Sequence, residues 1–144
     1  MIVDKVLGNI HEKKPEKTLV MVSFEWFETE KYRQIKEAKD GTMIGLHVSK
    51  GIRDGDIIAE TKKKAYIAEI VPVKVIKIPI SSLEEMGRVC FELGNRHLPV
   101  KIADRCITVP HDDPTFLHLL KHGFRLEIVS EKFADYLQCR GHKV

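Results

Sequence analysis

The strongest constraint on the fold of this chain is a change in the spacing of its apolar residues near residue 72. Before that point, short segments with the alternation and residue types of β-strands are separated by turn residues. Asp40-Gly41 and Asp54-Gly55 mark two of the turns, because such residues tolerate the left-handed backbone conformation that tight turns require. Regularly spaced short strands favour a small all-β sandwich or barrel. The expected strands cover residues 2–7, 19–24, 32–37, 43–48, 56–60 and 65–70.

From Val73 onward the order of expected elements becomes strand, helix, strand, strand, helix, strand. That order, βαββαβ, is typical of the ferredoxin-like arrangement. The sequence therefore predicts an α+β protein with an all-β domain over residues 1–72 and a ferredoxin-like domain over residues 73–144. The expected strands of the second domain cover residues 73–78, 98–102, 106–109 and 124–129.

The first expected helix follows a pair of serines. Ser81 or Ser82 can cap it, because each is followed three residues later by a glutamate that completes a capping box. Gly94 is expected to end the helix, since glycine best tolerates the left-handed conformation at a helix C-terminus. The helical spacing between these points predicts one buried stripe, made of Leu83, Met86, Cys90 and Leu93.

The second expected helix carries two histidines. Asp113 as the cap, followed by Pro114 in the first turn, predicts its start, and Gly123 predicts its end. His118 and His122 are four residues apart, a separation at which two imidazoles can chelate a metal. Both fall on the face opposite the apolar residues, so the pattern favours exposed polar positions over a metal site. The residues expected to be buried are Phe116, Leu117, Leu119 and Leu120.

The composition excludes several classes of function. The chain has 24 basic and 21 acidic residues, and its net charge of +3 is spread along the sequence, which does not indicate a nucleic-acid-binding protein. No stretch approaches the roughly 20 apolar residues that cross a bilayer, and the first residues lack the charged-then-apolar order of a signal peptide. Three cysteines without paired spacing indicate a reducing compartment. We therefore expect a cytoplasmic protein that binds neither nucleic acid nor membranes.

His97 follows the first helix in the stretch Gly94-Asn95-Arg96-His97, with no second histidine nearby. A neutral imidazole is the commonest transition-metal ligand, yet a single imidazole cannot hold an ion tightly. Two interpretations stay open. The histidine can be an ordinary residue bonded to the backbone at the start of a strand. If it lies on a twofold interface instead, its copy from a second chain faces it, and one sequence position supplies two ligands.

No catalytic motif accompanies this histidine. The sequence has no glycine-rich phosphate loop, no Gly-x-Ser-x-Gly turn and no His-Glu-x-x-His pair. A catalytic cysteine would require Cys90 or Cys106 to meet His97 in space. Cys90 belongs to the buried stripe of its helix, where a free cysteine usually serves as a small apolar residue. The sequence therefore predicts a protein that is not an enzyme.

The other histidines are less constrained. His47 is expected on the outer face of its strand, and His11 lies in a polar loop. His111 lies in the loop before the second helix, where a metal ligand and a plain loop residue are both plausible. His142 follows Cys139 by three residues, and such a Cys-x-x-His pair would favour zinc or copper(I) over nickel.

Several stretches resemble one protein family. The segments Glu85-Met86-Gly87 and Phe91-Glu92-Leu93-Gly94-Asn95-Arg96-His97 are similar to the core motif of the urease accessory metallochaperones, the UreE family, which deliver nickel to urease. Arg53-Asp54-Gly55-Asp56 resembles part of that family's N-terminal domain, and the segment from Tyr136 to His142 resembles the histidine-bearing tail of some members. The resemblance spans the whole chain, and Gly-Asn-Arg-His is its most specific part.

The resemblance implies a homodimer that binds Ni2+ through its ferredoxin-like domain and protein partners through its all-β domain. Carried over by position, His97 would be the ligand shared across the twofold axis, His142 on a mobile tail would complete the site, and His111 would add a further ligand. Zn2+ and Cu2+ are expected to bind the same site in vitro. The implied partners are the urease apoprotein and the urease accessory proteins, including the accessory GTPase, and a metal-bridged tetramer stays open.

A carrier of this kind must also release its ion. Ligands at an interface and on a tail permit ligand exchange, whereas a closed tetrahedral cage would not. Because ligating histidines must be neutral, we predict that metal affinity falls as the pH drops below about 6.5. Binding that stayed unchanged through that range would count against histidine ligation. The competing interpretation is a protein-interaction adaptor in which both domains are scaffolding and His97 is structural.

Overall fold

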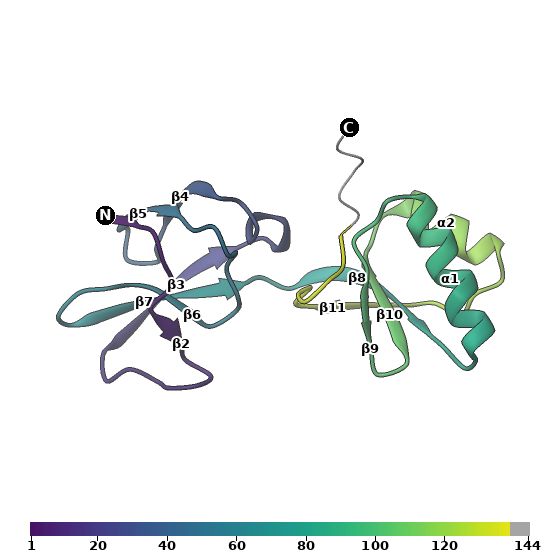
Figure 1. Cartoon of the computed structure of the whole chain (residues 1–144), viewed down its shortest axis with the longest axis horizontal. Coiled ribbons are helices and arrows are strands. Elements are labelled where there is room, and N and C mark those ends of the chain that lie inside the picture. The colour runs from purple at the N-terminus through teal and green to yellow at the C-terminus, as the bar shows by residue number, and fades with distance from the viewer. Residues whose placement is uncertain (139–144) are drawn as a thin grey trace. The chain divides into compact units, whose positions relative to one another are not determined.

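The structure is a computed structural model that describes residues 1–138 of the chain. It divides between Val71 and Pro72 into two compact units, each with its own sheets and its own core. In Figure 1 the first unit runs from purple to teal and the second from teal to yellow. None of the helices among the described residues is long and apolar enough to cross a membrane.

The first unit is a sandwich of two sheets, which confirms the predicted all-β domain. Strands β1, β5 and β4 form a three-stranded sheet, and β2, β6, β7 and β3 form a four-stranded sheet. The pairs β1 with β5 and β3 with β7 are parallel, and the others are antiparallel. The elements are β1 (Ile2–Val3), β2 (Gly8–Asn9), β3 (Thr18–Phe24), the 3-10 turn η1 (Trp26–Glu28), β4 (Arg33–Glu37), β5 (Met43–His47), β6 (Asp56–Glu60) and β7 (Lys64–Ile70).

The start of the chain differs from the sequence prediction. A single strand was expected over residues 2–7, but β1 ends at Val3 and a second short strand, β2, follows. The reason is that the chain crosses between the sheets here. Ile2 pairs with β5 of one sheet, whereas Gly8 pairs with Ile57 of β6 in the other.

The core of the first unit lies between its two sheets. Ile44 and Leu46 of β5 are buried while Met43 is 53% exposed, which is the alternation that the sequence predicted. Strands β6 and β7 lie in the middle of their sheet and are buried almost continuously. Apolar residues cover both faces of these strands, since a second small cluster around Ile57 and Ile67 packs on the side away from the main core.

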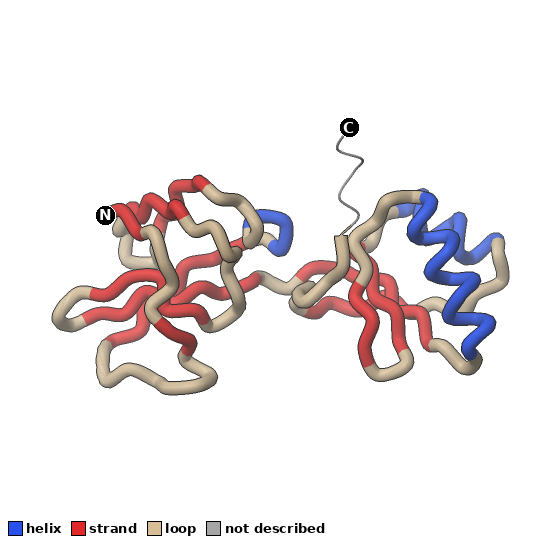
Figure 2. Tube along the Cα trace, in the orientation of Figure 1, coloured by secondary structure: helices blue, strands red, loops and turns tan. Residues whose placement is uncertain are grey.

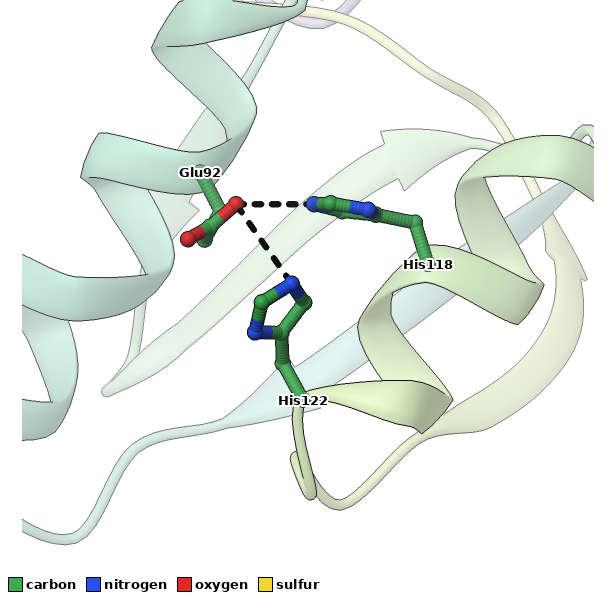
Figure 3. Close-up of side chains that lie close together, drawn as sticks. All are labelled: Glu92, His118 and His122. Carbon is green, nitrogen blue, oxygen red and sulfur yellow. Dashed lines mark hydrogen bonds and ion pairs between the residues drawn. The ribbon is translucent and has the colours of Figure 1, made fainter.

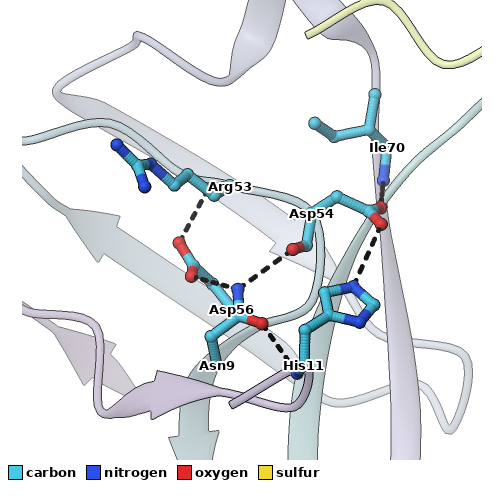
Figure 4. Close-up of polar contacts among 6 residues, drawn as sticks. All are labelled: Asn9, His11, Arg53, Asp54, Asp56 and Ile70. Atoms are coloured by element: carbon cyan, nitrogen blue, oxygen red, sulfur yellow. Dashed lines mark hydrogen bonds and ion pairs between the residues drawn. The ribbon is translucent and has the colours of Figure 1, made fainter. Parts of the chain in front are cut away.

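The stretch Arg53-Asp54-Gly55-Asp56 forms a hydrogen-bonded corner that joins three strands (Figure 4). The buried Asp56 carboxylate accepts the Arg53 amide at 2.7 Å and the side-chain amide of Asn9, in β2, at 3.0 Å. Asp54 accepts the amide of Ile70, at the end of β7, at 2.9 Å. These carboxylates therefore satisfy backbone donors and hold the corner together.

The second unit has the ferredoxin-like fold that the sequence predicted. Its four strands form one antiparallel sheet in the order β11-β8-β10-β9, and both helices pack on one face of it (Figure 2). The core between the helices and the sheet includes Ile76, Ile107, Val89, Leu93 and Leu119, all fully buried. The elements are β8 (Val73–Pro79), α1 (Leu83–Asn95), β9 (Lys101–Ala103), β10 (Cys106–Pro110), α2 (Asp113–Lys121) and β11 (Glu127–Glu131).

Helix α1 begins as predicted, but its buried stripe is different. Ser82 caps the helix by accepting the Glu85 amide at 3.1 Å. Val89 and Leu93 are buried, whereas Leu83, which was expected in the stripe, is 89% exposed. Leu83 lies about 100° around the helix axis from the centre of the buried face, so its side chain points away from the sheet.

Three starts of elements in the second unit were predicted at the wrong residues. The cap of α2 is Asp112 rather than Asp113, because the Asp112 carboxylate accepts the Thr115 amide at 2.8 Å. The strands expected over residues 98–102 and 124–129 begin later, at Lys101 and Glu127. In both cases the preceding residues close a helix: Leu98 and Phe124 donate their amides back to Leu93 and Leu119, respectively.

Candidate metal-binding residues

His97 closes helix α1. The helix continues through Asn95, one residue beyond the predicted end at Gly94, and the left-handed residue after it is His97, with φ of 55°. The amide of His97 donates to the Gly94 carbonyl at 3.0 Å, and that of Leu98 donates to the Leu93 carbonyl at 3.3 Å. This pair of bonds is the Schellman arrangement, in which the left-handed position is usually occupied by glycine. Gly94 therefore lies inside the helix and does not supply the cap.

The backbone conformation of His97 is uncommon for a residue other than glycine. A left-handed conformation costs a residue with a Cβ atom roughly 1–2 kcal/mol relative to glycine, and conformations of this kind concentrate at functional sites. His97 is also exposed, and it lies in the turn after the helix rather than at the start of β9. His97 therefore does not stand at the start of a strand, and it is exposed.

Arg96 connects the end of α1 to the start of α2. Its guanidinium donates to the hydroxyl of Thr115 at 3.5 Å. Thr115 is fully buried and donates in turn to the Asp112 carboxylate at 2.8 Å. The arginine of the Gly-Asn-Arg-His stretch therefore has a positioning role, because it ties the turn that carries His97 to the neighbouring helix.

His111 precedes α2 and is largely covered. Its amide donates to the Lys74 carbonyl at 3.0 Å, and its side chain is 20% exposed. The ring lies beside Phe116, with centroids 6.1 Å apart, and Nε2 is 3.7 Å from an Asp113 carboxylate oxygen. His142 and Cys139, the other residues expected to contribute ligands, lie outside the described residues.

Within residues 1–138, three side chains gather their ligand atoms closely enough for one metal ion, and neither His97 nor His111 is among them. They are Glu92 of α1 with His118 and His122 of α2, whose ligand atoms lie within 4.8 Å of one another. Figure 3 shows the two imidazoles pointing toward the carboxylate across the space between the helices. His118 Nε2 lies 2.7 Å from Glu92 Oε2, and His122 Nε2 lies 4.0 Å from the same oxygen.

This arrangement corrects the prediction for α2. His118 was expected on a solvent face, but its side chain is 30% exposed and hydrogen-bonded to Glu92, whereas Leu117 and Leu120 are 61% and 53% exposed. The reason is that α1 packs beside α2 and covers the histidine side. The hydrogen bond from His118 lowers the pKa of Glu92, so the carboxylate stays ionised. The sequence shows the i, i+4 histidine pair, but it does not show that Glu92 of the other helix lies beside it.

The two cysteines within residues 1–138, Cys90 and Cys106, do not form a reactive site. Cys90 packs beside Met86, with the sulfur atoms 3.8 Å apart, and burial raises the pKa of its thiol. A raised pKa disfavours the thiolate, which is the nucleophilic form. The half-buried Cys106 directs its sulfur to the neighbouring Ile107 carbonyl at 3.8 Å.

Comparison with known proteins identifies relatives for both units. Residues 3–69 match the model of the UreE urease accessory protein, N-terminal domain, and residues 73–141 match that of the C-terminal domain. A urease accessory protein UreE from Bifidobacterium longum subsp. infantis is 43% identical over 144 residues, which cover 99% of this chain and 65% of the relative. The chain thus spans about two thirds of that relative's length.

Two further relatives are covered more completely. The urease accessory protein UreE of Flavobacterium johnsoniae is 30% identical over 150 residues, covering 99% of this chain and 91% of the relative. That of Acetivibrio thermocellus is 33% identical over 126 residues, covering 85% of this chain and 82% of the relative. The similarity therefore extends across both units.

Proposed function

This chain belongs to the UreE family of urease accessory proteins, and from that premise we propose that it binds nickel and delivers it to urease during assembly of the metal centre. The observations that carry the proposal are the exposure and the backbone conformation of His97. Its imidazole is exposed at the end of α1, on a backbone conformation that glycine would adopt more readily. A histidine kept there, at a cost in stability, is best explained by a use for its side chain.

The proposed site lies on a twofold axis, so that His97 from each of two chains binds the same ion. The exposed side of α1 supports a dimer interface. Leu83, Gly87 and Phe91 recur every four residues and therefore line one side of the helix, and Leu83 and Phe91 are 89% and 66% exposed. Exposed apolar residues aligned in this way are typical of a surface that another protein covers. His97 follows directly at the end of the same helix.

The remaining ligands are proposed to come from His142 and His111. His142 lies in the segment beyond the described residues, and His111 precedes α2 with its ring partly accessible. Imidazole ligands suit nickel, zinc and copper alike, so Zn2+ and Cu2+ are expected to compete for the site in vitro. Selectivity for Ni2+ would then depend on supply and on the receiving partner. An ion captured at the interface can be released when ligands of the receiving partner replace the histidines.

The first unit is proposed to bind protein partners. The proposed partners are the urease apoprotein and the other urease accessory proteins, including the accessory GTPase, in the cytoplasm. The match of residues 3–69 to the N-terminal domain of the UreE urease accessory proteins supports this proposal. The protein acts as a carrier and not as an enzyme.

Nickel titration by calorimetry tests the central proposal. We expect the wild-type protein to bind one Ni2+ per dimer with high affinity, and His97→Ala to weaken this binding by at least roughly tenfold, because it removes two ligands at once. His47→Ala is the matched control: it removes a half-buried histidine of the first unit, whose ring stacks on Tyr32 at 6.2 Å. Equal nickel binding by wild type and His97→Ala would contradict the proposal and favour an adaptor without a metal role.

A further inference from the structure

We propose that Glu92, His118 and His122 form a second metal site, contained within one chain and separate from His97, which takes a divalent transition ion of the zinc, nickel and copper class. The site lies between α1 and α2 (Figure 3). It combines two imidazole nitrogens with one carboxylate, a set of ligands that suits these ions. It depends neither on a dimer nor on the segment beyond residue 138.

The distances between the ligand atoms fit an ion after small movements. Nitrogen and oxygen ligands at about 2.1 Å from a tetrahedral ion lie roughly 3.3 Å from one another. The Glu92 oxygen is now 2.7 Å from His118 Nε2 and 4.0 Å from His122 Nε2, so these distances bracket that value. Shifts of about 1 Å, which side-chain torsions can provide, would bring all three atoms onto one ion.

The helices already hold the three side chains in place. His118 and His122 are one turn apart on α2, and their rings lie 4.5 Å apart, centroid to centroid. Glu92 faces them because α1 and α2 are joined at a second point, where the Arg96 guanidinium meets the hydroxyl of Thr115. Ligands on two packed helices lose little freedom when they bind, so less of the binding energy is spent on ordering them.

The surroundings leave room to complete the coordination shell. The side chains of Glu92, His118 and His122 are 23%, 30% and 42% exposed, so an ion can enter from solvent. Glu92 and His122 also line a surface cavity of about 300 Å3, together with Gly87, Phe91 and Phe124. Three protein ligands beside such a cavity correspond to an open site, in which water or a donor from another molecule takes the fourth position.

A simpler role for the same residues must be separated from metal binding. The hydrogen bond of 2.7 Å between His118 and Glu92 is by itself a reasonable contact between two helices. It does not require His122, whose nitrogen is too far from Glu92 for a hydrogen bond. A metal site uses both histidines, whereas the interhelical contact uses one, so variants of His122 distinguish the two roles.

The test uses the full chain carrying His97→Ala and His142→Ala, which removes the principal ligands of the proposed nickel site. We expect calorimetry with Zn2+ to show about one ion bound per chain in this background. Glu92→Gln, His118→Gln and His122→Gln should each weaken zinc binding by at least about tenfold, because each removes a ligand. His11→Gln should have no effect. It is the matched control, since His11 also faces a carboxylate, that of Asp54 at 3.7 Å, but without a second imidazole.

The ring nitrogens provide a second measurement. In nitrogen-15 spectra of the same background, Zn2+ should shift the ring signals of both His118 and His122, while thermal unfolding confirms that each variant is folded. Failure to bind zinc, or zinc binding that His122→Gln leaves unchanged, would overturn the proposal and leave an interhelical ion pair only. Because His97 is absent from this background, the outcome is independent of the nickel titration of the wild-type protein.

Discussion

At the scale of the single residue, His97 combines a proposed role in metal binding with a backbone conformation that suits glycine. Its φ of 55° lies in the left-handed region, which most residues avoid. Few of the described residues share this conformation without being glycine, and two of them, Asp104 and Arg105, form the tight turn between β9 and β10. Those two serve the hairpin, whereas the turn at His97 would form at least as well with glycine in its place.

We therefore predict opposite effects of His97→Gly on stability and on binding. Metal-free His97→Gly should raise the free energy of unfolding by roughly 0.5–1 kcal/mol, since relief of the left-handed strain exceeds the entropy that glycine adds to the unfolded chain. Nickel affinity should fall as it does in His97→Ala, which loses the ligand without relieving the strain. Urea unfolding with a chelator present, together with nickel titration, measures both effects. A less stable His97→Gly protein would show that the imidazole supports the fold.

At the scale of the element, the turn between β4 and β5 depends on one carboxylate. Asp40 accepts hydrogen bonds from Lys64 Nζ and from the Tyr66 hydroxyl, each at 2.9 Å, and from the Thr42 amide at 3.0 Å. The hydrogen bond from Lys64 is the main reason that the pKa of Asp40 is held well below its ordinary value of 3.8. The carboxylate thus links the turn to the neighbouring strand β7.

The lowered pKa of Asp40 gives a pH dependence with a definite sign. A carboxyl group whose folded pKa lies below its unfolded value stabilises the fold above the unfolded pKa, and this contribution is lost as the pH falls through the folded pKa. Asp40→Asn should therefore cost stability at pH 5–7, and the difference from wild type should shrink once the pH falls below about 3.8. Urea unfolding of both proteins across this range tests it. A difference that stayed constant with pH would mean that the charge of Asp40 does not contribute.

The corner before β6 gives a second test at this scale. Gly55 has φ of +85°, and a Cβ atom there would lie 2.7 Å from the His11 ring and 3.1 Å from the Asn9 side chain. Gly55→Ala should therefore reduce the free energy of unfolding by about 1–3 kcal/mol, through both backbone strain and the clash. Gly41→Ala is the control, because Gly41 has φ of +88° but no atom within 4 Å of the added Cβ. Thermal or urea unfolding measures the free energy of unfolding of both variants. If both lose the same amount, the clash does not contribute to the loss.

The elements themselves were largely predictable from the sequence, whereas their ends and partners were not. Alternation located β5, and helical spacing located α1, because both patterns reflect burial on one face. The cap at Asp112 was missed because Asp113 beside it has the same chemistry, and only the hydrogen bond to Thr115 decides between them. The contact of His118 with Glu92 joins residues 26 positions apart, so no local pattern could reveal it.

At the scale of the whole molecule, the exposed side of α1 predicts the behaviour of the protein in solution. Phe91 is 66% exposed, so Phe91→Glu should leave the fold intact but place a charge in the proposed interface. We expect sedimentation analysis to show a shift from dimer toward monomer. Leu117→Glu is the matched control, because Leu117 is 61% exposed on α2. A dimer that persists in Phe91→Glu would place the interface elsewhere.

The position of His97 would have an electrostatic consequence for the proposed dimer. The peptide dipoles of a helix add along its axis, so the C-terminal end of the 13-residue helix α1 carries a partial negative charge next to His97. In a twofold dimer, two such helix ends would face the same cation. This attraction belongs to the backbone, so replacing the imidazole does not remove it. The helix dipoles would therefore hold any nickel that His97→Ala still binds, and the affinity of this variant should fall as salt is added. The nickel affinity of the wild-type protein, which would bind through imidazole nitrogens, should persist at high ionic strength.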